Sequence, residues 1–180
     1  MDHANNAFDF LLNIVHWFVT FIFLLRLILQ FLAVNMSNPI SQAIFNLTQP
    51  VLALLQLIFP TIKGLNTAAL VVLFFTQLIT IFLQTKLIGM PIGNLQLLAT
   101  AILVLSKYVL GFYFWTIILS AILSWLPNSA YNPLAQIANS ITSPILQPIA
   151  SRLPLIGGID FSPIAALIII KFIEILLFGG

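Results

Sequence analysis

Charged residues are the scarcest feature of this 180-residue chain. Lys, Arg, Asp and Glu together make up 6% of it, whereas 61% of the residues are hydrophobic. A soluble domain normally carries about 25% charged residues. Water could not cover a globule made from so few charges, so the sequence predicts a protein whose natural solvent is lipid.

Cysteine is absent, which excludes disulfides, thiolate chemistry and Cys-based metal sites. Six basic residues stand against four acidic ones, and no basic run exists, so the electrostatic footprint of a nucleic-acid-binding protein is missing. The sequence also lacks metal-ligand spacings, a nucleophile–base grouping and a phosphate-binding glycine loop. We therefore expect a non-enzymatic protein without metal or cofactor.

Four apolar stretches are candidates for membrane spans, each of which needs about 20 residues. They cover residues 7–34, 66–84, 95–126 and 163–178. The fourth is short unless residues 159–162 contribute. The predicted fold class is an all-α membrane protein with four transmembrane helices.

An internal repeat relates the two halves of the chain. Asn38-Pro39 recurs as Asn132-Pro133, an offset of 94 residues (132 − 38). The same offset brings Gln42 onto Gln136, Thr48 onto Thr142, Pro50 onto Pro144 and Pro60 onto Pro154. We divide the chain into a first repeat, residues 1–90, and a second repeat, residues 91–180. Because each repeat holds two spans, the repeats are predicted to be parallel, with both Asn-Pro segments at one membrane face.

The Asn-Pro segments lie between the spans of each repeat. Asn caps free backbone N–H groups, and Pro suits the first position of a helix. The apolar positions predicted to face the core are Ile40, Ala43, Ile44 and Leu47 in the first segment and Leu134, Ile137, Ala138 and Ile141 in the second. Pro50 and Pro144 are expected to restart the chain into a further short helix. We favour helices in the headgroup plane; re-entrant segments lining a pore are the alternative.

Polar residues inside the spans are costly and therefore informative. Counted from the Asn-Pro side, Arg26 and Lys171 both lie about 12 Å deep. The predicted intramembrane polar layer consists of Arg26, Gln30, Gln77, Thr80, Ser120, Ser124, Lys171 and Glu174. We predict that Glu174 pairs with Arg26, with Lys171 as its competitor. The layer either joins the repeats structurally or forms an ion or proton path, and His16 and Lys107 suggest a second polar site.

The string from Arg152 to Pro163, with Gly157-Gly158-Ile159-Asp160-Phe161-Ser162-Pro163 inside it, resembles the YggT family of small membrane proteins. The motif residues are Asn38, Pro39, Thr48, Pro50, Asn132, Pro133, Thr142, Pro144, Arg152, Pro154, Gly157, Gly158, Asp160, Ser162 and Pro163. Ser162 is interpreted as the N-cap of the fourth span, with Asp160 at its positive end and Gly157-Gly158 as a tight turn. The string is interpreted either as a structural corner or as a functional site, and the sequence favours neither.

The resemblance implies a multi-pass protein of the bacterial cytoplasmic (inner) membrane, with relatives in cyanobacteria and plastids. It connects the family with osmotic or ion stress, cell division and cytochrome maturation, and with no established set of catalytic residues. The first functional hypothesis is a membrane scaffold, assembly factor or stress-response factor whose partners are the lipid bilayer and a second copy or another membrane protein. The alternative is a small ion or solute channel or transporter that uses the polar layer. Lys63 and Arg152 against Lys86 favour cytoplasmic Asn-Pro segments.

Overall fold

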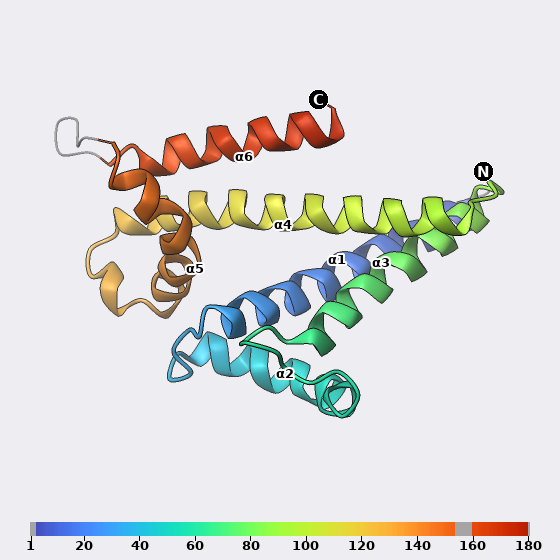
Figure 1. The fold of residues 1–180 in the computed structure, drawn as a ribbon, viewed down its shortest axis with the longest axis horizontal. Coiled ribbons are helices and arrows are strands. Elements are labelled where there is room, and N and C mark those ends of the chain that lie inside the picture. Colours follow the sequence, from blue (N-terminus) through green and yellow to red (C-terminus); the bar gives the residue numbers. More distant parts are fainter. Residues whose placement is uncertain (1–2, 154–159, 180) are drawn as a thin grey trace. The chain divides into compact units, whose positions relative to one another are not determined.

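The computed structural model describes residues 3–153 and 160–179, and this part of the chain is helical without a strand. The elements are α1 (His3–Phe31), α2 (Pro39–Gln56), α3 (Thr67–Leu87), α4 (Asn94–Ser124), the short 3-10 helix η1 (Ser129–Tyr131), α5 (Pro133–Ala150) and α6 (Ser162–Phe178) (Figure 1). The two ends of α5 lie 94 residues beyond those of α2 (133 − 39 and 150 − 56). The offset found in the sequence therefore reappears in the helix boundaries.

Among the described residues, three helices are long and apolar enough to cross a membrane: residues 5–31 of α1, and the whole of α3 and α4. The fourth predicted span, α6, has 17 residues. At 1.5 Å per residue it is about 26 Å long, somewhat less than a hydrocarbon core of about 30 Å. The structure thus supports an all-helical protein with three clear candidate spans, and the four-span arrangement stays a prediction.

The chain forms two compact units. The first unit comprises Met1–Ala33 and Ile44–Tyr108, and the second comprises Val34–Ala43 and Val109–Gly180. These units differ from the repeats predicted from the sequence because α4 is one continuous helix that contributes to both units. The predicted repeat boundary at residue 90 is a boundary in sequence and stays a prediction.

The antiparallel helices α1 and α3 form the centre of the first unit, where they lie side by side (Figure 1). Small and branched side chains are fully buried at the start of α3, where Ala68, Ala69 and Leu73 are inaccessible. A turn from Ile62 to Leu65 precedes α3, with Gly64 at φ 84°, a conformation that glycine adopts without strain. The close approach of the two helices brings their polar side chains within hydrogen-bond distance.

Each Asn-Pro segment is a single helix of 18 residues, so the predicted restart at Pro50 and Pro144 is wrong. Proline removes a backbone donor from a helix, and at Pro144 a nearby hydroxyl group compensates. Ser143 Oγ donates to the carbonyl of Ser140, 3.5 Å away, which the ring nitrogen of Pro144 cannot bond. In the turn before Pro50, Thr48 Oγ1 donates to the carbonyl of Ile44 at 2.7 Å, whereas Pro50 removes the backbone donor of the Asn46 carbonyl.

The predicted core-facing side of α2 is also wrong. Leu47 is 57% exposed, whereas Ser41, Thr48 and Leu52 are fully buried. When the surroundings are lipid, apolar residues suit the outside of the protein as well as its inside, so small polar residues can take the packed face. In α5 the prediction holds better, since Ile137, Ala138 and Ile141 are buried and Leu134 is exposed.

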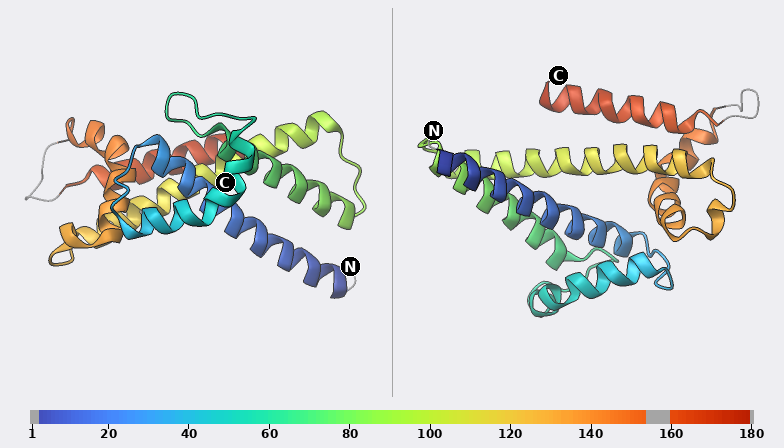
Figure 2. Two further views of the ribbon diagram at one scale, coloured as in Figure 1. Left: turned by 90° about the horizontal axis from the view of Figure 1, so that it is seen from below. Right: turned by 180° about the vertical axis from the view of Figure 1, so that it is seen from behind.

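The second unit is built where α4 ends and α6 begins, with α5 between them in sequence and beside them in space (Figure 2). Ile117 of α4 and Ala166 and Ile170 of α6 form its main buried cluster, against which Ile145 and Leu146 of α5 pack. A second cluster joins Leu123 to Ala135 and Ala138. These contacts hold α4 and α6 against α5.

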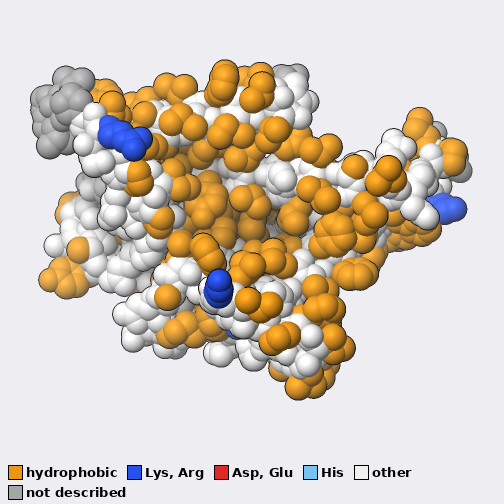
Figure 3. Space-filling model, viewed as in Figure 1, with side chains coloured by type: hydrophobic (Ala, Val, Ile, Leu, Met, Phe, Trp, Pro, Cys, Tyr) orange, Lys and Arg blue, Asp and Glu red, His pale blue; other side chains and the backbone are white. Residues whose placement is uncertain are grey.

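Hydrophobic side chains cover most of the face shown in Figure 3, with Lys and Arg at only a few points. Among the exposed large residues, Trp115 is 69%, Phe172 65% and Leu176 73% accessible. Apolar patches of this kind mark surfaces that contact lipid or another protein. The exposed surface and the three candidate spans are compatible with a membrane protein.

Candidate functional site

A series of hydrogen-bonded side-chain pairs runs along the contact between α1 and α3, and we call it the polar ladder. Its rungs are Gln84 with Asp9 and Asn13 (both 3.1 Å), Thr80 with His16 (2.9 Å), Gln77 with Thr20 (3.2 Å) and Asn66 with Gln30 (2.9 Å). From Gln84 to Gln77, each step of three or four residues along α3 matches a similar step back along α1, and the rung of Asn66 with Gln30 lies eleven and ten residues further on. This spacing is that of antiparallel helices packed along a heptad seam.

Beyond the rung of Gln84, most side chains of the ladder are buried. Thr20, Gln77 and Asn66 are inaccessible, and His16 and Thr80 are each 6% exposed. The ring of His16 also meets the edge of Tyr108, with ring centroids 5.2 Å apart. Because most of these polar atoms bond each other directly, the ladder joins the two helices without needing water between them.

Arg26 lies on α1 but outside the ladder, and it contacts α2. It is 3% exposed, Nη2 donates to Oε1 of Gln49 at 3.2 Å, and its guanidinium carbon lies 3.4 Å from the centre of the Phe45 ring. Within residues 3–153 and 160–179, its Nε and Nη1 atoms have no hydrogen-bond partner. Arg26 therefore fastens α1 to α2 through an aromatic contact and keeps donors that could serve an anion.

The equivalent positions of the second repeat also contact each other, with different chemistry. Ser120 stands at the position of Arg26 and Asn139 at that of Phe45, and Ser120 Oγ donates to Asn139 Oδ1 at 2.6 Å. Thr142 Oγ1 donates to Ser120 Oγ at 3.3 Å. The helix–helix contact is thus retained between the repeats, although a cation–aromatic pair has been exchanged for a hydroxyl–amide pair.

Lys171 and Glu174 of α6 form an ion pair, with 2.7 Å between Nζ and Oε2. The Lys171 Nζ atom also lies 5.1 Å from the centre of the Phe114 ring. Within the second unit the acid pairs with the residue predicted to compete for it, and its predicted pairing with Arg26 of the first unit stays a prediction. Residues three apart on a helix share a face, so this local pair forms without any contact between helices.

The predicted polar residues do not form one layer within the first unit. Gln30 bonds Asn66, while Thr80 bonds His16, fourteen residues earlier on α1, which corresponds to about 21 Å along the helix. The depth estimate failed because α1 ends at Phe31, three residues before the predicted end. Arg26 is therefore five residues from its helix end, whereas Gln77 is ten residues from the start of α3. In the second unit, Ser124 of the predicted layer is exposed at the end of α4, and its hydroxyl donates to the carbonyl of Ala121 in the same helix.

The motif asparagines cap helices as predicted. Asn38 Oδ1 accepts from the N–H of Ile40 at 2.9 Å, and Asn132 Oδ1 accepts from that of Leu134 at the same distance. Asn38 Nδ2 also donates to the carbonyl of Pro133 at 2.8 Å, within the second unit. The two Asn-Pro segments therefore begin side by side.

Two further motif pairs match between the repeats. Gln42 and Gln136 each donate from Nε2 to a backbone carbonyl six residues earlier, at 2.9 and 2.8 Å. Thr48 and Thr142 each donate to the carbonyl four residues earlier, at 2.7 and 2.9 Å. These bonds explain why both residue types recur at the same places in the sequence.

The corner before α6 differs from the prediction in one respect. Ser162 is the first residue of the helix rather than its cap, and Asp160 receives the hydrogen bonds, from the Ser162 N–H at 2.8 Å and from its hydroxyl at 2.9 Å. Asn66 holds the equivalent place before α3, where its Oδ1 accepts from Ala69 N at 3.0 Å. Pro163 lies in the first turn, and Arg152 is exposed. Pro154, Gly157 and Gly158 lie outside the described residues.

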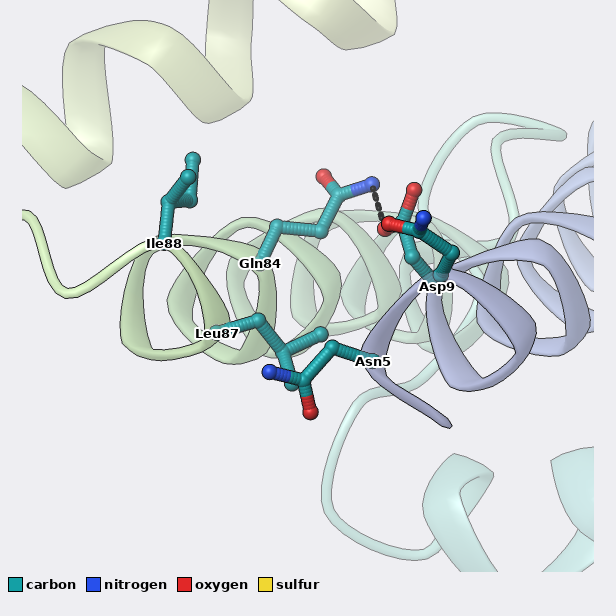
Figure 4. A pocket seen from close by; sticks show the side chains of 6 residues that line it. Asn5, Asp9, Gln84, Leu87 and Ile88 are labelled. Atoms are coloured by element: carbon teal, nitrogen blue, oxygen red, sulfur yellow. Dashed lines mark hydrogen bonds between the residues drawn. The ribbon is translucent and has the colours of Figure 1, made fainter. Parts of the chain in front are cut away.

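A polar pocket of about 300 Å³ opens at the end of the ladder (Figure 4). Asn5, Asn6, Asp9, Gln84, Leu87 and Ile88 line it. Sequence reasoning missed this pocket and the ladder behind it. The signal was present in the four-, three- and four-residue steps between Asp9, Asn13, His16 and Thr20. In the described part of the chain, no cluster of His, Asp and Glu could hold a metal ion.

Comparison with known proteins matches the chain to the CCB3/YggT family twice, over residues 5–87 and 99–180. A relative named as an uncharacterized protein of Pseudomonas aeruginosa is 37% identical, over 98% of this chain and 90% of its own length. The uncharacterized protein YggT of Escherichia coli K12 is 29% identical, over 94% and 88%. An uncharacterized protein of Haemophilus influenzae is 32% identical, over 85% and 81%. No solved structure matches the chain. With both repeats matched by one family model, the chain belongs to the CCB3/YggT family.

Proposed function

We propose that this protein is a non-enzymatic membrane scaffold or assembly factor of the bacterial inner membrane, with four spans arranged as two parallel repeats. The observation that carries the proposal is the polar ladder, in which buried polar side chains bond each other directly across α1 and α3. A conducting path needs polar groups that face water or an ion. Here the same groups are used to hold two helices together.

The pocket at the end of the ladder supports this interpretation. Its lining reaches Asp9 and Gln84, whereas the next rung, His16 with Thr80, does not contribute to it. The pocket is therefore a recess at the helix ends, and the buried rungs close the interface behind it. A scaffold needs a rigid helix pair of this kind, and a recess at its end suits contact with headgroups or a partner.

The parallel arrangement of the repeats is supported by the hydrogen bond between Asn38 and Pro133. Parallel repeats place both Asn-Pro segments at one membrane face, where this bond can form. Inverted repeats would separate the two segments by the thickness of the bilayer. The cationic residues Lys63 and Arg152 near the Asn-Pro segments, against Lys86 at the opposite end, favour a cytoplasmic location for that face.

The second candidate function is a small ion or solute channel or transporter, and Arg26 is the observation that favours it. A buried guanidinium with two donors that lack described partners is an expensive group unless an anion reaches it. On this alternative, an anion would pass or bind beside Arg26 and Gln49.

Purified protein in liposomes separates the two functions. Fluxes of protons, potassium and chloride are measured with trapped dyes, and vesicles without protein set the background. The scaffold predicts fluxes at background, for the unchanged chain and for Arg26→Gln alike. Chloride flux that Arg26→Gln abolishes, in a variant with unchanged thermal stability, would establish the channel instead.

A further inference from the structure

The face of α6 that carries Lys171 and Glu174 is too polar for lipid and too exposed for a protein interior. The side chain of Lys171 is 54% exposed and that of Glu174 is 23% exposed. Lys171 lies nine residues after Ser162, about 14 Å into a predicted span. Ionisable groups at such a depth normally face the interior of a helix bundle.

The first repeat shows how the same positions are covered. Gln77 and Thr80 are the equivalents of Lys171 and Glu174, and they are 0% and 6% exposed because Thr20 and His16 of α1 bond them. In the second repeat, the equivalents of these two α1 residues are Phe114 and Leu110. Neither side chain can accept or donate a conventional hydrogen bond. Helix α4 therefore cannot do for α6 what α1 does for α3.

A groove lies on this face of α6, beside Phe114 of α4. It has a volume of about 440 Å³, and Phe114, Ile164, Leu167, Ile168, Lys171, Phe172 and Ile175 line it. Apart from Lys171, its lining is aliphatic and aromatic. A groove with an apolar wall and one lysine, next to the Glu174 that pairs with this lysine, fits a transmembrane helix that brings both apolar side chains and an opposite charge.

We propose that a second copy of this chain covers this groove, with the two α6 helices packed about a two-fold axis along the membrane normal. This proposal rests on the scaffold function and names its partner. Two-fold symmetry places identical residues at identical depth. Lys171 of each copy then faces Glu174 of the other, about one helical turn away along the axis, which a lysine side chain can span. The four charges alternate, so the surface is complementary to itself.

Charge reversal tests the proposal. Lys171→Glu makes a copy with two acids on this face, and Glu174→Lys makes a copy with two bases. Each variant alone is expected to dimerise several-fold less than the unchanged chain. Mixing the two variants, each with its own affinity tag, is expected to restore pairing between unlike copies. Lys86→Glu, an equal charge change at the end of α3, is the control and is expected to leave pairing unchanged. Pairing that is unaffected by reversal, or not restored by mixing, would overturn the proposal and indicate that the first unit or another protein covers α6.

Cysteine cross-linking tests the geometry without disturbing the charges. The chain has no natural cysteine, so a single introduced cysteine can form a disulfide only with another molecule. Ile168 lies on the groove face and is 64% exposed, whereas Ile169 is 48% exposed and points about 100° away around the helix. Ile168→Cys is expected to give disulfide-linked dimers in native membranes, and Ile169→Cys is not.

Equal cross-linking of the two variants, or none at position 168, would contradict the proposed interface. Cross-linking reports only the interface, and the flux assay reports only transport. The dimer and the scaffold function can therefore fail independently of each other.

Discussion

Replacing Asn66 by Ala removes two functions of one fully buried side chain. Its Oδ1 atom caps α3 at the N–H of Ala69 (3.0 Å), and its Nδ2 atom donates to Gln30 of α1 (2.9 Å). Losing an N-cap costs about 1 kcal/mol. Losing a side-chain hydrogen bond between membrane helices costs about 0.6–1.7 kcal/mol. We expect Asn66→Ala to lower the free energy of unfolding by about 2 kcal/mol, the sum of these terms.

Two variants separate the terms. Asn66→Ser keeps a good cap and loses the bond to Gln30, so we expect it to recover about 1 kcal/mol of the loss. Asn132→Ala, at the start of α5, removes a cap and is expected to cost about 1 kcal/mol. Unfolding by SDS in mixed micelles, followed by the fluorescence of the three tryptophans, gives the free energies. Equal losses for Asn66→Ala and Asn132→Ala would refute the interhelical role of Asn66.

Three further predictions concern the other buried polar groups. Gln77→Leu removes the bond to Thr20, but it also removes a buried carbonyl oxygen without a described partner. Because the two effects oppose each other, the unfolding free energy is expected to change by no more than about 1 kcal/mol. A loss above about 3 kcal/mol in the same SDS titration would contradict this. Arg26→Met retains volume and removes a buried charge that forms no ion pair within the described part of the chain, so it is expected to be no less stable than the unchanged chain. Arg26→Ala leaves a cavity and is expected to lose about 2 kcal/mol; a Met variant that is less stable would show that the charge is satisfied. A double-mutant cycle of Lys171→Gln and Glu174→Gln is expected to give a coupling energy of about 0.5–1 kcal/mol, and strictly additive losses would refute the ion pair.

The repeat was the most reliable guide to the fold. Because Asn38 and Asn132 stand in one register, both caps, the prolines after them and the starts of α2 and α5 could be placed from the sequence. Caps and first-turn prolines depend on bonds within a few residues, so their chemistry is visible locally. The sequence analysis missed that the helices continue through Pro50 and Pro144; at Pro144 the hydroxyl of Ser143 bonds the carbonyl that has lost its backbone donor.

The site was harder to predict because it depends on which helix faces meet. The predicted contact of Arg26 with Glu174 rests on equal depth alone, and depth says nothing of helix rotation; α1 also ends earlier than expected. The amphipathic pattern of α2 predicted an apolar packed face, and the structure buries Ser41 and Thr48 instead. In lipid, hydrophobicity no longer separates inside from outside. The heptad spacing of polar residues in α1 was the better signal, since it points to the side that faces a partner helix.

The most direct test of the account asks whether water reaches the polar ladder. The natural chain is free of cysteine, so Gln77→Cys, Thr20→Cys and the exposed control Lys86→Cys can each be labelled with a membrane-impermeant thiol reagent. Gln77 and Thr20 are fully buried and bond each other, so the account predicts that positions 77 and 20 stay unlabelled in reconstituted vesicles under conditions that label position 86 completely. Rapid labelling of position 77 or 20 in folded protein would show a water-filled path through the helix pair and would contradict the structural role of the ladder.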